Sequence, residues 1–357
     1  MNKTIGICGY GSSGSSAFVD ILREFENVRI MDSIEFRMMW LPDGLRDLEF
    51  HIKKYISPIN STVAINRFRR HIKKCFSYYF GKYQYAGYKE KIDRAVESFL
   101  NKIIVDSWKR GYGDLALYEK KPLVLWFVRR AARVLRMHKL RQRLDQIILY
   151  NYEDTIKTPE IFDDAAKIFV LSIMEIICEK YCDKKEGMIT VTDQLFSPFN
   201  PVETFGFFEN PKAIIVNRDP RDMYLFSKLY LRPRGLIIFP TDNVDDFIKR
   251  YRLTRKTQQE RNDVMVINFE ELVYDCENAT KKIMGFLGLT AQIHKGEFFK
   301  PAHSRNNTQL FKKYKGYESE IKRIEQELSE YIFPFENYPD IEPEGEMFWG
   351  SQHKKRC

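Results

Sequence analysis

Short runs of consecutive apolar residues recur at both ends of the chain and are rare in its middle. Runs of four or five residues, rich in β-branched side chains, occupy positions 4–8, 28–31, 188–192, 213–217 and 264–268. Unbroken runs of this kind are typical of parallel strands that are buried on both faces. Residues 15–25, 244–261 and 279–287 show helical spacing instead, and Asn243 stands where a helix cap is expected. The alternation predicts a three-layer α/β fold with a mainly parallel central sheet of about five strands.

Between residues 45 and 182 the pattern becomes helical, aromatic and basic. Apolar side chains recur at helical spacing over 89–110, Pro122 can open a helix that runs to about residue 150, and Pro159 can open another that ends near Gly187. The chain is therefore predicted to consist of three parts. These are an α/β core of residues 1–44 and 188–335, a helical and basic insertion of residues 45–187, and a C-terminal tail of residues 336–357.

The positive charge of the chain is concentrated in this insertion. Residues 51–150 contain 23 Lys and Arg against 7 Asp and Glu, whereas the whole chain of 357 residues has a net charge of +9. Such a surplus predicts an anionic partner or a membrane surface. The helical pattern of residues 123–144, apolar on one face and arginine-rich beside it, fits peripheral membrane contact. The charge alone would also fit nucleic acid, which we do not expect, or a solvated basic face.

The six cysteines show neither metal-ligand nor disulfide-framework spacing. Cys178 and Cys182 lie one helical turn apart in an apolar stretch, which predicts buried thiols rather than zinc ligands. The N-terminal apolar run is too short for a secretory signal, and no apolar stretch reaches the roughly 18 residues of a membrane span. We therefore expect a cytoplasmic protein in a reducing compartment, with possible peripheral attachment at the inner membrane surface.

A glycine- and serine-rich loop follows the first predicted strand and precedes the first predicted helix. It reads Gly-Tyr-Gly-Ser-Ser-Gly-Ser-Ser over residues 9–16. Strand, glycine-rich turn and helix form the arrangement in which backbone N–H groups surround an anion. Ser15 stands where a nucleotide-triphosphate loop of the type G-x-x-x-x-G-K-[ST] has its lysine, which argues against a kinase or NTPase.

A second motif follows the predicted strand 213–217. Arg218 stands at the carboxyl end of this strand, and Asp219-Pro220 makes a turn into a helix. In open α/β sheets ligands bind at this edge, so Arg218 is a candidate phosphate clamp.

Together the two motifs resemble those of the sulfotransferases that use 3′-phosphoadenosine 5′-phosphosulfate (PAPS), nearest in style to bacterial and carbohydrate sulfotransferases. These proteins have a P-loop-like fold, a loop of the type [KR]-[SG]-G-[ST]-[ST], and a strand followed by R-[DN]-P-[KR]-D, which residues 218–222 match. Residues 266–289 resemble the family's strand and helix ending F-L-G-L, and 299–307 its cofactor-covering loop. The resemblance covers roughly residues 4–40 and 188–330.

The resemblance implies a PAPS site without a metal. The residues that it assigns to the 5′-phosphosulfate are Gly11, Ser12, Ser13, Gly14, Ser15 and Ser16. It assigns Arg218 and Ser227 to the 3′-phosphate, and Ser304 and Arg305 to the covering loop. In two places the chain departs from the family. Ser12 stands where the family has Lys or Arg, and Ser227 follows Arg218 by nine residues instead of eight, which requires a turn one residue longer or another phosphate contact.

The resemblance also implies a general base for the acceptor hydroxyl. Glu35, just beyond the second strand, occupies the position of the glutamate in the carbohydrate branch of the family, with Asp32 as a nearby alternative. Asp193, followed by Gln194, occupies the strand end where cytosolic members have a histidine, so the histidine version is absent and Glu35 is the better candidate. His303 is a lone loop histidine and a weaker candidate.

The sequence thus predicts a PAPS-dependent sulfotransferase that acts on a hydroxyl of a carbohydrate or lipid-linked glycan, with the insertion as acceptor or lid region. Two alternatives stay open: a P-loop kinase or NTPase, and a non-catalytic relative that binds anionic glycans or membranes.

Overall fold

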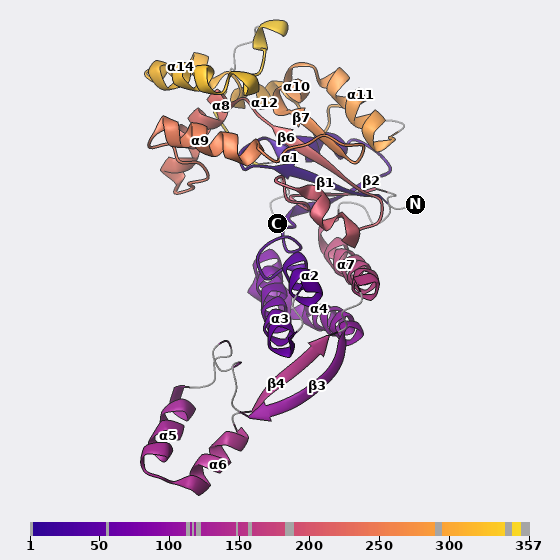
Figure 1. The fold of residues 1–357 in the computed structure, drawn as a ribbon. Coiled ribbons are helices and arrows are strands. Elements are labelled where there is room, and N and C mark those ends of the chain that lie inside the picture. The colour runs from indigo at the N-terminus through magenta and orange to yellow at the C-terminus, as the bar shows by residue number, and fades with distance from the viewer. Residues whose placement is uncertain are drawn as a thin grey trace. The chain divides into compact units, whose positions relative to one another are not determined.

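The computed structural model describes residues 3–54, 57–111, 115, 118, 123–147, 149–155, 159–182, 189–289, 295–339 and 345–350 (Figure 1). The chain separates into two compact units, one of residues 1–37 and 177–357 and one of residues 38–176. Each unit is described by itself.

The first unit is built on a five-stranded parallel sheet. Its strands are β1 (Lys3–Gly9), β2 (Val28–Glu35), β5 (Ile189–Asp193), β6 (Pro211–Asn217) and β7 (Val264–Asn268). They lie in the order β2-β5-β1-β6-β7, and every neighbouring pair is parallel. The predicted α/β fold class is confirmed, and each of the five predicted apolar runs forms one strand of the sheet.

Both faces of β1 are covered, which explains its unbroken apolar sequence. Ile5 and Ile7 belong to a core cluster that also contains residues of α1 (Ser15–Leu22), α10 (Phe269–Tyr274) and α11 (Cys276–Leu287). On the other face a Cβ at Gly6 would lie 2.3 Å from the Phe196 ring, so Phe196 packs directly on the strand. Each fully buried large side chain of this kind contributes about 1.5–3 kcal/mol.

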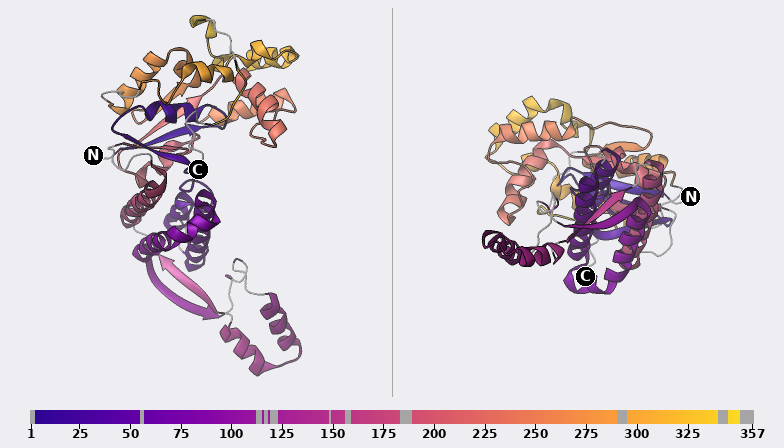
Figure 2. Two further views of the ribbon diagram at one scale, coloured as in Figure 1. Left: turned by 180° about the vertical axis from the view of Figure 1, so that it is seen from behind. Right: turned by 60° about the horizontal axis from the view of Figure 1, so that its bottom comes forward.

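The remaining helices of this unit surround the carboxyl end of the sheet (Figure 2). They include α8 (Pro220–Leu225), α9 (Val244–Arg255), α12 (Pro301–Ser304), α13 (Leu310–Lys313) and α14 (Glu318–Glu327), with short 3-10 or π turns at Pro201–Phe207, Phe226–Leu231, Arg232–Arg234, Arg305–Asn307, Ser329–Tyr331 and Phe335–Asn337. Asn243 caps α9 as expected, because its side chain accepts a hydrogen bond from the Asp245 N–H. The helix ends at Arg255, six residues before the predicted end.

The second unit contains long helices around an aromatic core. The helices are α2 (Leu45–Lys54), α3 (Pro58–Phe80), α4 (Lys82–Ile103) and α7 (Pro159–Tyr181), the last of which continues into the first unit. Phe68, Phe99 and Phe169 pack against one another with ring centroids 5.0–5.8 Å apart, and Phe162 adds a further edge contact to Phe99.

Two helix predictions in this unit were wrong. The helix predicted for 89–110 ends at Ile103, and β3 (Ile104–Gly111) then pairs antiparallel with β4 (Leu149–Thr155). The helix predicted from Pro122 to about residue 150 is split into α5 (Leu123–Val134) and α6 (His138–Ile147), because Arg136 adopts a left-handed conformation with φ +52°. Pro122 itself and Gly187 lie outside the described residues.

The cysteine prediction also needs correction. Cys178 and Cys182 are half-buried and are joined by a disulfide, so they are not the buried thiols that the apolar surroundings suggested. None of the described helices is long and apolar enough to cross a membrane. In the same part of the chain no group of His, Cys, Asp and Glu side chains could hold a metal ion.

Gly14 is expected to be irreplaceable in the turn between β1 and α1. Its φ is +89°, and a Cβ there would lie 2.4 Å from the Phe269 ring. Gly14→Ala should therefore lower the free energy of unfolding by about 1–3 kcal/mol, because it adds both backbone strain and a clash. Denaturant unfolding measures this change.

Gly285→Ala is the matched control. Gly285 lies inside α11, where a Cβ would meet nothing within 4 Å, so the same substitution should stabilise the protein by about 0.5–1 kcal/mol. Equal stability of the Gly14 variant and the wild type would contradict the packing described for this turn.

Candidate functional site

The predicted site residues of the α/β core gather at the carboxyl edge of the parallel sheet. The glycine- and serine-rich loop follows β1, Glu35 ends β2, Asp193 ends β5 and Arg218 follows β6. Parallel strands bring their carboxyl ends to one edge, which is where open α/β sheets bind ligands. A hydrogen bond from Arg218 to the Asn307 carbonyl joins the 301–307 segment to this edge.

The loop after β1 exposes backbone N–H groups rather than a charged side chain. Gly11, Ser12 and Gly14 all have positive φ angles, of +85°, +59° and +89°. Gly14 is the residue before the first turn of α1, and neither a side-chain cap nor an acidic residue satisfies that turn. The free N–H groups and the helix dipole therefore favour an anion at this end of α1.

Arg218 is the cation of the site. Its side chain is 3% exposed, and one terminal nitrogen donates to the Ser12 carbonyl at 2.7 Å while the other donates to the carbonyl of Asn307. The guanidinium lies over the ring of Phe226 at 4.9 Å and that of Phe269 at 5.6 Å. Burial lowers the pKa of Arg218, and the carboxyl groups of Asp222, Glu270 and Asp219 oppose that shift in this order.

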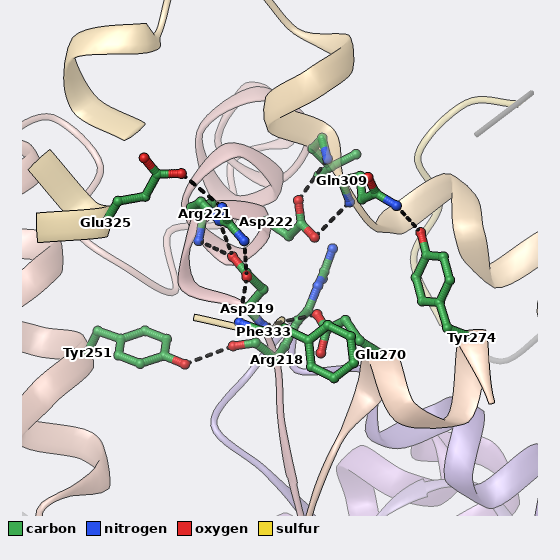
Figure 3. A network of polar contacts seen from close by, with 11 residues as sticks. Arg218, Asp219, Arg221, Asp222, Tyr251, Glu270, Tyr274, Gln309, Glu325 and Phe333 are labelled. Atoms are coloured by element: carbon green, nitrogen blue, oxygen red, sulfur yellow. Dashed lines mark hydrogen bonds and ion pairs between the residues drawn. The ribbon is translucent and has the colours of Figure 1, made fainter. Parts of the chain in front are cut away.

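The other charged residues of the 218–222 motif hold the surrounding segments together. Asp219 accepts hydrogen bonds from the N–H groups of Arg221 at 2.8 Å and Phe333 at 3.0 Å. Asp222 accepts from the N–H groups of Gln309 at 2.8 Å and Leu310 at 2.7 Å. Figure 3 shows these bonds converging on the turn that contains Arg218. Asp219 and Asp222 therefore hold the backbone around the site in place. The side chain of Arg218 takes no part in these bonds.

Arg221 also belongs to this architecture. Its guanidinium pairs with Asp219 at 2.8 Å and with Glu325 of α14 at 2.8 Å, and it lies 4.0 Å from the centre of the Phe311 ring. Burial lowers the pKa of Arg221, but the bonds to Asp219 and Glu325 outweigh that effect, so the pKa is raised and the guanidinium stays charged. Arg221 therefore neutralises the carboxylate that supports the backbone next to Arg218.

Two buried carboxyl groups beside Arg218 are held partly neutral. Burial and the charge of Asp219 raise the pKa of Glu270 to about 8, and burial and Asp219 likewise raise the pKa of Asp222. Glu270 accepts the Asp219 N–H at 2.9 Å. Because raised pKa values favour the uncharged acids near neutral pH, the site repels an incoming anion less than its carboxyl groups would suggest.

Several buried polar atoms near Arg218 have no hydrogen-bond partner among the described residues. They are Ser12 Oγ, Ser13 Oγ, Arg218 Nε, Ser227 Oγ, Arg305 Nε, Gln309 Oε1 and Glu270 Oε2. Buried polar groups in proteins are nearly always satisfied by protein or water, so such a concentration needs an explanation. Five of the seven atoms, the three hydroxyls and the two guanidinium nitrogens, can donate a hydrogen bond. The set is therefore suited to an anionic ligand.

Ser227 reaches this region through an irregular helix. Phe226–Leu231 forms a π-helical turn in which the Arg232 N–H donates to the Ser227 carbonyl, and such a turn accommodates one more residue than an α-helical turn. This turn follows Ser227 in the chain, whereas Pro220–Leu225 before it is α-helical, so it does not lengthen the segment between Arg218 and Ser227. Phe226 covers Arg218, and Ser227 is 3% exposed.

The two predicted carboxylates differ in their surroundings. Glu35 has a side chain that is 53% exposed and pairs with Arg37. Asp193 lies opposite Glu35 in the register of β2 and β5, and burial together with the Glu35 charge raises the pKa of Asp193 to about 7. The hydroxyl of Ser15 forms a hydrogen bond with this carboxyl group. Asp193 is therefore directly connected to the anion loop.

The covering segment contains the remaining predicted residues. Ser304 is buried, Arg305 is half-buried and His303 is exposed, with its ring 4.0 Å from that of Phe348. The Asn307 side chain donates to the Phe348 carbonyl and accepts from the Phe348 N–H, so residue 348 is anchored to this segment.

The sequence reading missed two residues of the site. Glu270 could have been found, because it lies one residue into the helix that directly follows β7 and so stands at the same sheet edge. Asn307 carried no such signal, because it contributes a backbone carbonyl to Arg218.

The sequence matches no protein-family model and no curated protein. Among solved structures, the chain is similar to the sulfotransferase domain from the curacin biosynthetic pathway, with 13% identity, a TM-score of 0.33, and coverage of 94% of this chain and 99% of that chain. It is also similar to retinol dehydratase in complex with androsterone and the inactive cofactor PAP, with 12% identity, a TM-score of 0.32, and coverage of 95% and 82%.

Proposed function

We propose that this protein is a PAPS-dependent sulfotransferase that transfers a sulfuryl group to a hydroxyl of a carbohydrate or glycolipid acceptor. The observation that supports it best is the set of buried, unpartnered donors that surrounds Arg218 in the described part of the chain, beside the uncapped start of α1. These groups fit a ligand that has two separate anionic groups. PAPS is such a ligand, and when bound it supplies the sulfuryl group and a phosphate leaving group.

The loop after β1 would hold the 5′-phosphosulfate. The N–H groups of Ser12 to Ser16 and the hydroxyls of Ser12 and Ser13 are the available donors. Donors fixed before the reaction stabilise charge that develops on a leaving group more effectively than mobile water does. The Gly-Ser turn thus provides positioning and charge stabilisation without a triphosphate-binding lysine.

Arg218 can compensate for the missing cation at Ser12. Its guanidinium donates to the Ser12 carbonyl at 2.7 Å, so positive charge already lies beside the residue where the family has Lys or Arg. Its Nε and the Ser227 hydroxyl, together with Arg305 Nε, remain as donors for the 3′-phosphate. Ser304, which is buried in the same segment as Arg305, would help to shape the cover over the nucleotide.

Asp193 is the better of the two candidate bases. A general base works best when its pKa lies near the working pH, and Asp193 has a pKa of about 7 whereas Glu35 is exposed and paired with Arg37. Glu35 has a second role in this scheme, because its charge helps to raise the pKa of Asp193. Asp193 would accept the proton of the acceptor hydroxyl.

The acceptor assignment rests on the basic insertion. Its surplus of Lys and Arg over residues 51–150, with interleaved aromatic residues, suits a sugar that carries acidic groups, because aromatic faces pack on sugar rings and cations pair with acids. Two alternatives were left open by the sequence, a P-loop kinase or NTPase and a non-catalytic binding protein. Nucleotide binding distinguishes them from this proposal.

Nucleotide binding provides the first test. We expect 3′-phosphoadenosine 5′-phosphate to raise the melting temperature of the wild type in EDTA, and Ser227→Ala to weaken its affinity about tenfold, the usual loss for a hydrogen bond to a charged group. The unliganded variant should melt within about 1 °C of the wild type, because Ser227 Oγ has no partner among the described residues. Differential scanning fluorimetry and calorimetric titration measure both quantities.

Ser172→Ala is the matched control, since Ser172 Oγ bonds only to the Ile168 carbonyl on an exposed helix face of the second unit. It should leave nucleotide affinity unchanged. A melting shift with ATP and Mg²⁺ but not with the 3′-phosphonucleotide would favour the kinase, and no shift with either nucleotide would favour the non-catalytic binding protein.

The proposed base gives a second prediction. The rate of PAPS consumption with a pool of sugar acceptors should rise with pH through about 7, since Asp193 must lose its proton before it can accept another. Asp193→Asn should reduce kcat by about 10²- to 10⁴-fold, remove this pH dependence and leave nucleotide affinity unchanged. If Glu35→Gln instead abolishes turnover while Asp193→Asn retains it, Glu35 is the base.

A further inference from the structure

The second unit carries an exposed apolar stripe on α5 that the proposed chemistry does not use. Val124, Phe127, Val134 and Leu135 are 70%, 61%, 75% and 67% exposed. Val124, Phe127, Val128, Ala131 and Val134 recur at intervals of three and four residues, so they lie along one face of α5, and Leu135 continues this surface directly after the helix. Soluble proteins rarely leave such a continuous apolar face in contact with water, which marks the stripe as a docking surface.

The inner side of α5 is already occupied by its neighbour. α5 and α6 lie side by side in both views of the ribbon (Figures 1 and 2), and Ala132 of α5 and Leu144 of α6 are buried. The exposed stripe is therefore the outer face of a helical hairpin. Met137 in the connection between the two helices is 46% exposed and extends the apolar surface to the tip.

Positive charge surrounds this surface. Residues 123–147 contain six Arg and one Lys but only one acidic residue, Asp145. Arg130 lines a shallow hollow together with Phe127, Ala131, Val134 and Leu135. The side chains of Arg133, Arg136, Lys139 and Arg143 are exposed, and none of them forms an ion pair with another described residue. The occupant of the surface must therefore be both apolar and anionic.

We propose that the α5–α6 hairpin docks on a bilayer that contains anionic lipids. An apolar helix face enters the boundary between headgroups and acyl chains, while flanking Arg and Lys side chains reach the lipid phosphates. α5 has 12 residues and is about 18 Å long, so it lies on the roughly 30 Å hydrocarbon core and does not cross it. A second copy of the chain is a poorer occupant, because two such surfaces would bring like charges together.

The inference is independent of the proposed sulfotransferase activity, and its test needs no substrate. The full-length chain is mixed with vesicles of phosphatidylcholine alone or with 30% phosphatidylglycerol, and the bound fraction is measured by co-sedimentation at low and high salt. We expect binding to the anionic vesicles, at least about tenfold weaker binding to the neutral ones, and weakening by salt.

Two variants locate the contact. Phe127→Asp with Leu135→Asp should reduce the affinity for anionic vesicles at least about tenfold, because each substitution places a negative charge on the apolar stripe. Ile161→Asp with Ile168→Asp is the matched control, since both residues are exposed on a helix, α7, in the same unit. It should leave vesicle binding unchanged. Melting temperatures measured without vesicles verify that both variants are folded.

Three results would overturn the proposal. The first is no binding to anionic vesicles, the second is equal loss of binding in both double variants, and the third is retained binding in the stripe variant. Dimerisation of the wild type that is abolished only by the stripe substitutions would assign the surface to a second copy of the chain.

Discussion

The burial of one guanidinium group at the carboxyl edge of the sheet is the constraint on which the core and its site both depend. Arg218 is nearly inaccessible, and its contacts join the loop after β1 to the 301–307 segment. Moving a cation out of water costs several kcal/mol unless charge and hydrogen bonds compensate it. The carboxyl groups of Asp219, Asp222 and Glu270 provide part of that compensation, and their hydrogen bonds also join α10, α13 and the backbone at residue 333 to this turn.

The same arrangement explains why an anion would bind there. Glu270 and Asp222 are only partly charged near pH 7, because burial and the charge of Asp219 raise their pKa values. Arg218 therefore keeps an unmatched part of its positive charge, and its Nε has no partner among the described residues. The Ser12 carbonyl that Arg218 contacts belongs to the loop after β1, which is rich in free N–H groups and hydroxyls. The positive field of the site thus comes from one buried arginine and a helix terminus, and not from a cation in the loop itself.

The parts of the fold that depend on local pattern could be predicted from the sequence. All five strands of the sheet, the start of α1, the cap of α9 and the position of Arg218 follow from apolar runs and turn residues close to one another in the chain. The β3–β4 ribbon could not be predicted, because residue 104 pairs with residue 155 and the apolar spacing before it continues a helical pattern. The split between α5 and α6 depends on the backbone of one ordinary residue, Arg136.

Only part of the site could be predicted from the sequence, for similar reasons. The glycine- and serine-rich loop and Arg218 have recognisable spacing, whereas the packing of Phe226 over the guanidinium follows from no spacing in the sequence. The raised pKa of Asp193 requires its burial beside Glu35, which only the paired strands reveal.

The central claim is that the edge around Arg218 holds a ligand with two anionic groups, and a crystal structure with 3′-phosphoadenosine 5′-phosphate tests it most directly. The account predicts the 5′-phosphate against the N–H groups of residues 12–16, and the 3′-phosphate within hydrogen-bond distance of Arg218 and Ser227 Oγ. Nucleotide bound away from the β1 loop, or a 3′-phosphate that contacts neither Arg218 nor Ser227, would contradict it.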